Sequence, residues 1–409
     1  MQDIAITGLG VISSLGHNVA EFCRNLSAAH VVVGPTPWNN EPSLENVWMS
    51  MVENFRAEDW MDERVVDGTD RFAQYAIAAA VQAVEACGID ELDAERTAVV
   101  VGTSCGGTET ITQSQEGLDR EGPSGVDRKL QIKAWPNMAA GQIALRWKLH
   151  GPLLTITTAC ASSIDAIGTA ARLIERGDCD VAITGGCESG RTRLTKIAGG
   201  LLGMMSPQSD PYKACRPFNT ERFGVMGGEG AGMVILERAD LARARGAKIH
   251  GYLRGYASLS DGYHPSSSNP DGSWEARTME MAIEDAGLPG GPDDVDAVIA
   301  HGTGTPLGDI AEIKAINRIF GGREKTLKVA SIKGHVGHTA GAAGVMGLLA
   351  ALHSMHESAL VPTAGTTDVM PEADFEVVIQ QPSPGELNTM QVNGFGFGGQ
   401  NASLVVTRN

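Results

Sequence analysis

The stretch Leu153-Leu-Thr-Ile-Thr-Thr-Ala-Cys160-Ala-Ser-Ser163 joins two structural patterns without a break. Residues 153–157 are apolar and β-branched, which is typical of a buried strand. A helical pattern begins at about residue 161 and continues to about residue 176. A strand that passes directly into a helix is the repeating unit of α/β proteins, so this stretch predicts an α/β fold.

Cys160 stands at the turn between that strand and that helix. The first N–H groups of a helix have no partner within the helix, and together with the helix dipole they favour a negative charge. We therefore expect the Cys160 thiol to have a lowered pKa and to act as a nucleophile. The alternative is a small buried cysteine without chemistry, which is a common role for this residue.

The same alternation extends in both directions along the chain. We expect strands at residues 2–7, 98–102, 180–184, 249–256, 295–301, 329–332, 391–393 and 403–407. We expect helices at residues 71–87, 278–286 and 310–320, and another from the glycine-rich segment 334–347 to about residue 356.

The rhythm of strands and helices restarts after about residue 245. This predicts two intertwined halves, residues 1–245 and 246–409, although no sequence repeat is readable between them. Segments 34–63 and 108–135 are expected to be surface excursions, because the first contains prolines and mixed charges and the second is polar.

The composition limits the possible functions. The 409 residues include 32 basic and 49 acidic side chains, and the net charge of −17 argues against a nucleic-acid-binding surface. No run of about 18 apolar residues occurs, so we expect no membrane-spanning helix. The seven cysteines are irregularly spaced and none forms a CxxC pair. This pattern predicts neither disulfides nor a zinc site. Together with the lack of a visible secretory signal, it leads us to expect a protein of the reducing cytoplasm.

Two histidine loops follow predicted strands. His301 begins His-Gly-Thr-Gly-Thr-Pro-Leu-Gly-Asp309, and His338 lies within Lys333-Gly-His-Val-Gly-His338-Thr-Ala-Gly-Ala-Ala-Gly344. Active sites of α/β folds lie at strand ends, and neighbouring glycines allow a ligand to approach the backbone. A single histidine is more often structural than catalytic. His335 competes with His338 for a role here, and spacing alone does not choose between them.

A last glycine-rich segment, Asn393-Gly-Phe-Gly-Phe397-Gly-Gly-Gln-Asn401, precedes the final strand. A backbone N–H in such a loop can polarise a carbonyl oxygen. The alternative is an ordinary glycine turn.

In this order, the four segments resemble those of the β-ketoacyl-acyl-carrier-protein synthases, which belong to the thiolase-like superfamily of condensing enzymes. The resemblance runs from Ile4 to Ser403, so it covers nearly the whole chain. It implies a thiolase-like, five-layered αβαβα fold built from two pseudo-duplicated halves. It also implies the elongating, carrier-protein-dependent branch, which condenses an acyl-cysteine with malonyl-carrier protein and uses neither a metal nor an organic cofactor.

The resemblance also assigns roles to residues. Cys160 matches the acylated nucleophile, His301 and His338 match the two active-site histidines, and Lys333 matches the supporting lysine; this selects His338 over His335. The N–H groups of Cys160 and Phe397 match the oxyanion hole. The resemblance places further residues in the substrate pocket and its gate: Cys105, Gly199, Thr303, Thr305, Phe395, Gly396, Phe397 and Gly398.

Several positions depart from the fatty-acid type. Gly304 stands where a serine is common, and Gly347 stands where a glutamate follows the GAAG motif. Gly199 aligns with a phenylalanine that gates the acyl pocket, so its loss should widen the pocket, and Cys105 aligns with an Ile-like residue at the pocket floor. We therefore expect a specialised polyketide or polyene synthase, with housekeeping fatty-acid elongation as the alternative.

The resemblance implies an acyl carrier protein as partner and a dimer, made either with a second copy or with a chain-length subunit. The basic surface for the carrier protein is thinned, because Arg64 remains but Asp67 and Gly68 stand where basic residues are common. A thiolase would need a second cysteine after Cys215, and none is present. The chain could also be a Cys-His hydrolase, but no motif in it marks a site that activates water. A non-catalytic chain-length subunit usually lacks the nucleophile that this chain carries.

Overall fold

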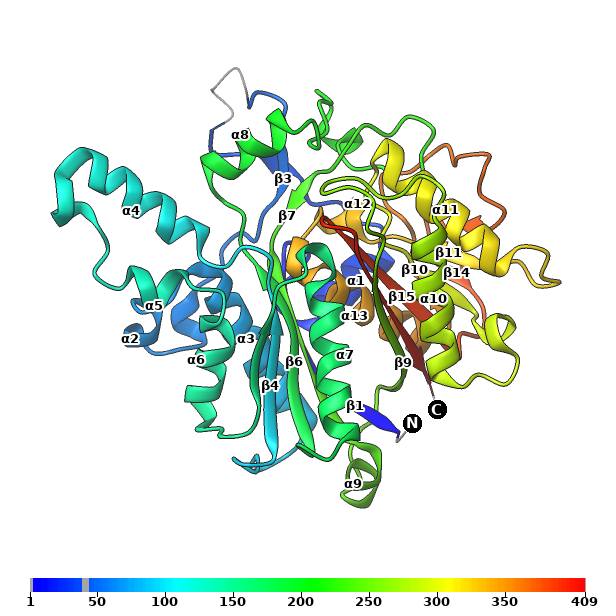
Figure 1. Ribbon diagram of the computed structural model, residues 1–409, viewed down its shortest axis with the longest axis horizontal. Helices are drawn as coiled ribbons and strands as arrows, with labels where there is room; N and C mark the ends of the chain where they lie inside the picture. Colours follow the sequence, from blue (N-terminus) through cyan, green and yellow to red (C-terminus); the bar gives the residue numbers. More distant parts are fainter. Residues whose placement is uncertain (1–2, 39–43, 409) are drawn as a thin grey trace.

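The computed structural model describes residues 3–38 and 44–408, and eleven strands of that part of the chain form one continuous sheet (Figure 1). Residue 2 of the first expected strand and residues 39–43 of the expected excursion lie outside the described residues. The strands are β1 (Ile4–Ser13), β4 (Thr97–Gly102), β5 (Leu153–Ile156), β6 (Val181–Glu188), β8 (Gly230–Arg238), β9 (Gly251–Ser260), β10 (Ala297–Ile299), β11 (Lys328–Ala330), β13 (Glu376–Val377), β15 (Thr389–Gly396) and β16 (Gln400–Thr407).

The order of the strands contains one motif twice. The sheet runs β13-β11-β10-β15-β16-β9-β1-β8-β6-β4-β5. Numbered by chain position within each half, both β1-β8-β6-β4-β5 and β9-β16-β15-β10-β11 read 1-5-4-2-3. In both halves the first two pairings are antiparallel and the last two are parallel. The predicted α/β fold with two pseudo-duplicated halves is confirmed, whereas a division at residues 245 and 246 stays a prediction.

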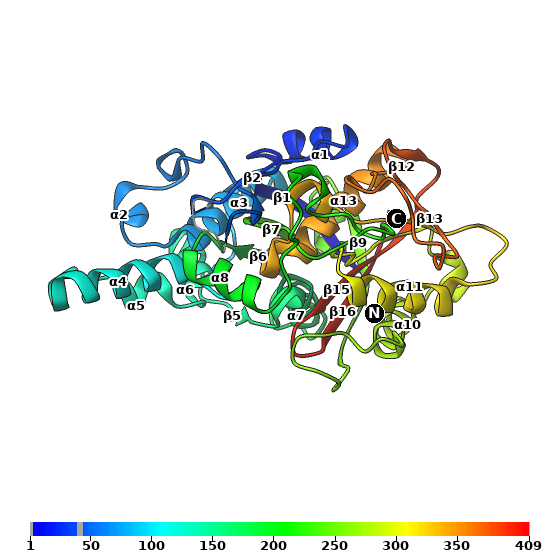
Figure 2. The same cartoon turned by 90° about the horizontal axis from the view of Figure 1, so that it is seen from above.

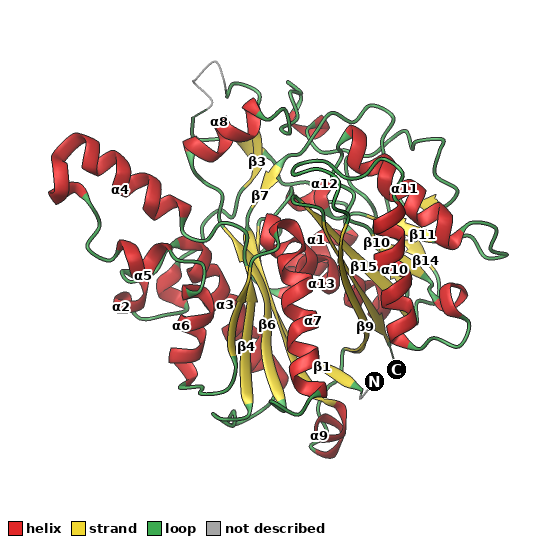
Figure 3. Ribbon diagram, in the orientation of Figure 1, coloured by secondary structure: helices red, strands yellow, loops and turns green. Residues whose placement is uncertain are grey.

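Helices form three layers around the two halves of the sheet (Figures 2 and 3). α7 (Ser162–Glu175) and α13 (Ala343–Glu357) contact each other and lie in the middle. The outer faces are covered by α3 (Arg71–Cys87) and α6 (Met138–Trp147) in the first half, and by α10 (Ser273–Ala286) and α11 (Pro306–Phe320) in the second half. This is the expected αβαβα arrangement.

Alternating side chains of each strand fill the layers. In β4, Ala98 and Val100 join the central core around α7 and α13, whereas Val99 and Val101 join the outer core around α3. Because successive side chains of a strand point to opposite faces, a strand covered on both faces must be apolar throughout. All six residues of β4 are buried, as its continuously apolar run predicted. The strand expected to be buried at residues 153–157 is not buried: it forms β5 at an edge of the sheet, and Leu153 and Leu154 are exposed.

The two central helices begin at matching turns. α7 follows a 3-10 turn at Ala159–Ala161, and α13 follows one at Ala340–Ala342. The sequences are Thr-Ala-Cys-Ala-Ser-Ser (158–163) and Thr-Ala-Gly-Ala-Ala-Gly (339–344), so a short repeat does exist and was not recognised in the sequence. In each turn the alanine before the central residue has a positive φ, 50° at Ala159 and 43° at Ala340. Such strain in a non-glycine residue persists only where the surrounding structure holds it.

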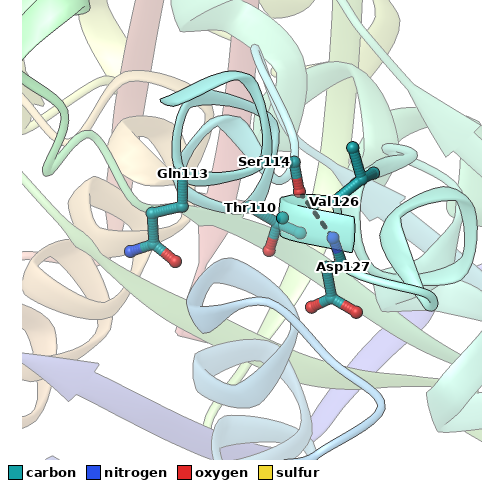
Figure 4. A pocket seen from close by; sticks show the side chains of 6 residues that line it. Thr110, Gln113, Ser114, Val126 and Asp127 are labelled. Atoms are coloured by element: carbon teal, nitrogen blue, oxygen red, sulfur yellow. Dashed lines mark hydrogen bonds between the residues drawn. The ribbon is translucent and has the colours of Figure 1, made fainter. Parts of the chain in front are cut away.

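Residues 108–135 form an arm that projects from the body (Figures 1 and 2), as expected for a surface excursion. The polar sequence hid the fact that most of it is helical, in α4 (Thr108–Glu121) and α5 (Leu130–Ala134). A polar pocket of about 200 Å³ lies at the base of α4, where Ser114 Oγ accepts a hydrogen bond from the Asp127 backbone (Figure 4).

Some expected boundaries were wrong. The strand expected at 180–184 continues to Glu188. Gly186 within it packs closely against the turn before α13, since a Cβ on Gly186 would lie 2.6 Å from the Gly341 oxygen. The helix expected from residue 278 begins at Ser273, and the one expected from 310 begins at Pro306. The remaining helices and strands are α1 (Val19–Ser27), β2 (Gly34–Pro35), β3 (Trp48–Ser50), α2 (Glu63–Val66), α8 (Arg193–Leu201), β7 (Gly227–Gly228), α9 (Ala239–Ala244), α12 (Lys333–Val336), β12 (Ala359–Leu360) and β14 (Ser383–Pro384).

Candidate active site

Cys160 and His338 meet at the two matching turns. Cys160 is the central residue of the turn before α7, and His338 comes two residues before the turn of α13. The Nε2 atom of His338 lies 3.0 Å from the Cys160 sulfur, within hydrogen-bonding distance. The strand-to-helix turn therefore places the cysteine as the sequence predicted, and the second histidine loop reaches it.

The backbone around His338 fixes the position of its ring and its tautomer. Its N–H donates to the Met226 carbonyl at 2.7 Å, and its carbonyl accepts from Gly228 N–H at 2.9 Å. The Ala340 N–H donates to Nδ1 at 3.3 Å. Because Nδ1 accepts, the neutral ring carries its proton on Nε2, which faces the sulfur.

His301 and Lys333 complete the cluster. The Lys333 amine lies 3.4 Å from His301 Nδ1 and donates to the His301 carbonyl. The His301 ring packs edge-on against His338 with centroids 5.4 Å apart, and Phe395 supports it at 5.8 Å. A lysine that donates to Nδ1 leaves the proton of His301 on Nε2, so both imidazoles present an N–H donor.

Burial keeps both histidines neutral. The pKa values of His301 and His338 are held well below their ordinary value, first because desolvation disfavours the cation and next because Lys333 repels it. Burial also lowers the pKa of Lys333, against the pull of Glu312 and other nearby acids. The site thus contains two neutral hydrogen-bond donors beside one amine.

The expectation of a lowered pKa for Cys160 is wrong. Desolvation raises the pKa of this thiol to about 11, and Glu188 adds to the rise. Lys333 and the N–H groups of Phe397 and Cys160 act in the opposite direction but do not outweigh burial. The helix start favours the thiolate, yet the residues that cover the sulfur decide the balance.

The glycine loop after β15 lies over Cys160. The N–H groups of Phe397 and Cys160 both face the sulfur and favour its anion. A Cβ on Gly396 would approach the Cys160 nitrogen to 3.1 Å, so glycine keeps that N–H accessible. Gly398 N–H donates to the Pro265 carbonyl at 2.8 Å, which ties the loop to the neighbouring segment. Phe397 is 41% exposed, at the rim of the site.

Two buried carboxylates shape the site and were missed in the sequence. Glu188, at the end of β6, accepts from the N–H groups of Ser104 (2.7 Å) and Gly341 (3.1 Å). Glu312, on α11, accepts from those of His301 (2.8 Å) and Gly302 (2.7 Å). Burial raises the pKa of both acids. The sequence did contain a signal for Glu312. Asp309 and Glu312 are three residues apart and so fall on the apolar, buried face of α11, where an acid is unusual.

The remaining predicted residues differ in their relation to the cluster. Thr303 and Thr305 share a hydrogen bond at 2.8 Å in the His301 loop. Cys105 is exposed as a residue, but its thiol is partly desolvated, and this together with the charge of Glu188 raises its pKa to about 11. Gly199 is buried on α8, where Met205 and Met204 are its nearest neighbours. His335 lies away from the sulfur, with its ring nitrogens 2.9 Å from the His30 oxygen and 2.7 Å from the Pro362 oxygen.

Over residues 3–38 and 44–408, no group of three or more His, Cys, Asp or Glu side chains is arranged to hold a metal ion. In the same part of the chain, no helix is long and apolar enough to cross a membrane.

Comparison with known proteins agrees with this geometry. The β-ketoacyl synthase N-terminal domain matches residues 1–242, and the C-terminal domain matches residues 250–367. The 3-oxoacyl-[acyl-carrier-protein] synthase 2 of Staphylococcus aureus (strain COL) is 36% identical over 405 residues, covering 98% of this chain and 97% of that protein.

Two solved structures are similar over the whole chain. The structure titled the ishigamide ketosynthase/chain length factor superposes with a TM-score of 0.92 at 30% identity, covering 100% of this chain and 99% of that one. A type II PKS acyl-carrier protein in complex with its ketosynthase bound to the hexaketide gives a TM-score of 0.90 at 26% identity, covering 100% of both chains.

Proposed function

The chain belongs to the β-ketoacyl synthase family and is an acyl-transferring condensing enzyme, and from this premise we propose that it extends a specialised polyketide or polyene chain held on Cys160. The observation that carries the proposal is the 3.0 Å contact between the Cys160 sulfur and His338 Nε2, with the His301 ring beside it.

In the first step the Cys160 sulfur attacks the thioester of an acyl-carrier protein. The C–S bond to the carrier breaks, a C–S bond to Cys160 forms, and the proton of the Cys160 thiol leaves with the carrier thiol. The N–H groups of Cys160 and Phe397 hold the developing oxyanion. Because burial raises the pKa of the resting thiol to about 11, these donors and the His338 Nε2–H supply the stabilisation of negative charge that the step requires.

In the second step a malonyl-carrier protein loses carbon dioxide, and the electron pair of the broken C–C bond becomes an enolate. His301 and His338 donate their Nε2–H groups to the enolate oxygen. Neutral rings suit this task because they donate without protonating the enolate carbon. Lys333 holds His301 in the required tautomer through Nδ1.

In the third step the enolate carbon attacks the acyl-Cys160 carbonyl. A C–C bond forms, the C–S bond breaks, and the product is a 3-oxoacyl-carrier protein two carbons longer. The Cys160 sulfur leaves as a thiolate and takes up one proton. Holding both thioesters within one site supplies much of the rate acceleration.

Two glycines support the specialised pathway over housekeeping elongation. Gly304 has φ +78°, and a Cβ there would lie 3.2 Å from both Arg216 N and the Gly224 oxygen, so the serine of the fatty-acid type would be strained in this loop. A Cβ on Gly347 would lie 3.1 Å from Val392, in an apolar layer that does not suit a glutamate. Similarity to the ishigamide ketosynthase/chain length factor points the same way. The 36% identity to 3-oxoacyl-[acyl-carrier-protein] synthase 2 keeps fatty-acid elongation as the second candidate.

The test measures acyl transfer and elongation with a panel of acyl-carrier proteins, reading the mass of the acyl group on Cys160 and of the product. The specialised pathway predicts a preference for unsaturated or oxygenated chains. Efficient elongation of saturated chains with rejection of the others would assign the enzyme to fatty-acid synthesis. Continued condensation after complete alkylation of Cys160 by iodoacetamide would overturn the catalytic scheme. Absence of any acyl transfer to Cys160 would favour a non-catalytic subunit.

The partners we propose are an acyl carrier protein and a second subunit. β5 is one of the two edge strands of the sheet, and Leu153 (49%) and Leu154 (40%) on it are exposed. An exposed apolar edge strand is usually covered by another chain.

The surface expected to bind the carrier protein has few free cations. Arg64 is the exposed basic residue of α2, and the nearby Lys129 is paired with Asp67 at 2.6 Å. The mass of the native complex distinguishes two copies of this chain from a pair with a chain-length subunit.

A further inference from the structure

The inward face of α8 carries an amine where an acyl pocket would be apolar. Lys196 and Gly199 are the buried residues of this helix, and they lie three positions apart on one face. Gly199 aligns with the pocket phenylalanine of the fatty-acid type. If α8 lines the acyl pocket at Gly199, then Lys196 lines it one turn earlier.

Lys196 is buried without a partner. Its exposed fraction is 7%, and none of residues 3–38 and 44–408 forms a hydrogen bond or ion pair with its amine. Desolvation lowers its pKa to about 8, and Glu229 opposes this only in part. An unpaired buried amine costs stability, so its presence needs an explanation.

Glu229 does not supply the missing partner. Its Oε1 accepts from Val52 N–H at 2.8 Å, from Arg191 Nε at 2.7 Å and from the Tyr75 hydroxyl at 3.3 Å. Its Oε2 is buried and has no hydrogen bond. Glu229 therefore attracts the Lys196 amine through its charge but forms no hydrogen bond with it.

Two glycines make room for the Lys196 amine next to a segment that pairs with the active-site histidine. A Cβ on Gly227 would lie 2.8 Å from the Lys196 amine, and one on Gly190 would lie 3.6 Å from it. Gly227 forms a parallel bridge with His338, the residue that contacts Cys160. The Lys196 amine thus packs against the backbone of Gly190 and Gly227, and Gly227 pairs with the histidine loop that contacts Cys160.

We propose that Lys196 forms a polar subsite of the acyl pocket, which binds an oxygen acceptor, a ketone or carboxylate, on the growing chain. This inference rests on the proposed function, since it needs an acyl group on Cys160. The amine acts by binding and forms no covalent bond. A hydrogen bond from a charged donor to a substrate oxygen is worth about 10- to 100-fold in selectivity. A methyl-ended chain would leave the amine desolvated and unpaired.

The first test uses the wild-type enzyme and acyl-carrier proteins of equal chain length that end in a methyl group, in a methyl ketone or in a carboxylate. The rate of Cys160 acylation, followed by intact-protein mass spectrometry, should be at least about tenfold higher for one of the oxygenated chains than for the methyl chain. Which of the two is preferred tells whether a ketone or a carboxylate is the ligand. Equal rates for all three, or preference for the methyl chain, overturn the inference without any mutation.

The second test compares Lys196→Met with the matched surface control Lys325→Met, which removes a lysine paired with Asp296 on the exterior. In Lys196→Met the rate of Cys160 acylation by the oxygenated substrate should fall about tenfold or more, whereas the rate with the methyl chain should be at least that of the wild type. Lys325→Met should leave the substrate ratio unchanged. An unchanged ratio in Lys196→Met would refute the subsite while condensation itself continues. Absence of acylation with every substrate in the wild type would instead refute the proposed function.

Discussion

Alkylation of Cys160 by iodoacetamide should be slow at neutral pH and should accelerate about tenfold for each pH unit up to about pH 10. Burial raises the pKa of this thiol from an ordinary 9.0 to about 11. Two pKa units reduce the thiolate fraction about 100-fold. A more basic thiolate is more nucleophilic and recovers roughly a factor of 10. The net expectation is a rate about tenfold below that of an unperturbed thiol at neutral pH.

The assay follows the alkylated Cys160 peptide by mass spectrometry at a series of pH values, with glutathione in the same tube as the reference thiol. Cys105 is a second thiol whose pKa is raised to about 11, so Cys105→Ser removes it from the measurement. Cys160→Ser identifies the signal that belongs to the active site. A rate that levels off below about pH 8, or that exceeds glutathione at pH 7, would show that the helix start outweighs burial and would refute the reasoning.

Three further changes test the site. Gly396→Ala places a methyl group 3.1 Å from the Cys160 nitrogen, so kcat for condensation should fall at least about tenfold while the melting temperature changes little; unchanged kcat would exclude an oxyanion hole there. Desolvation and, next, the charge of Lys333 depress the pKa of His301, so in Lys333→Met NMR titration should show that pKa rising and the acidic limb of the pH–rate profile should move to higher pH; a limb that stays in place would contradict this. Glu312→Gln loses a charged acceptor of two N–H groups of the His301 loop, so unfolding should become easier by about 1–3 kcal/mol in a denaturant titration, and wild-type stability would contradict this role.

The sequence predicted the layers of the fold because most of its strands are buried on both faces, although β5 is an exception. Runs such as 98–102 are apolar throughout, and the helix expected at residues 71–87 has these bounds in the structure. The motifs also placed Cys160 and the two histidines at strand ends, where the structure brings Cys160 and His338 within 3.0 Å.

Other features depend on which residues come together in space. Whether the thiol is acidic is decided by the groups that cover it, and these come from distant segments. Glu188 was missed because its strand continues through two glycines that resembled a turn. Lys196 was missed because a lone lysine in a mixed helix is usually at the surface, and its burial is visible only in the folded chain.

The two matching turns, one before α7 and one before α13, show why the chain has a thiol at only one of them. The turn of α13 has Gly341 at the place of Cys160, and a Cβ there would come within 2.7 Å of the Thr103 Cα and 2.9 Å of Glu188 Oε2. A second thiol installed by Gly341→Cys would collide with the backbone beneath the first one. Gly341 instead gives its N–H to Glu188. The two turns therefore share their backbone geometry but not their role, because the second turn supports Glu188 and the first carries the thiol.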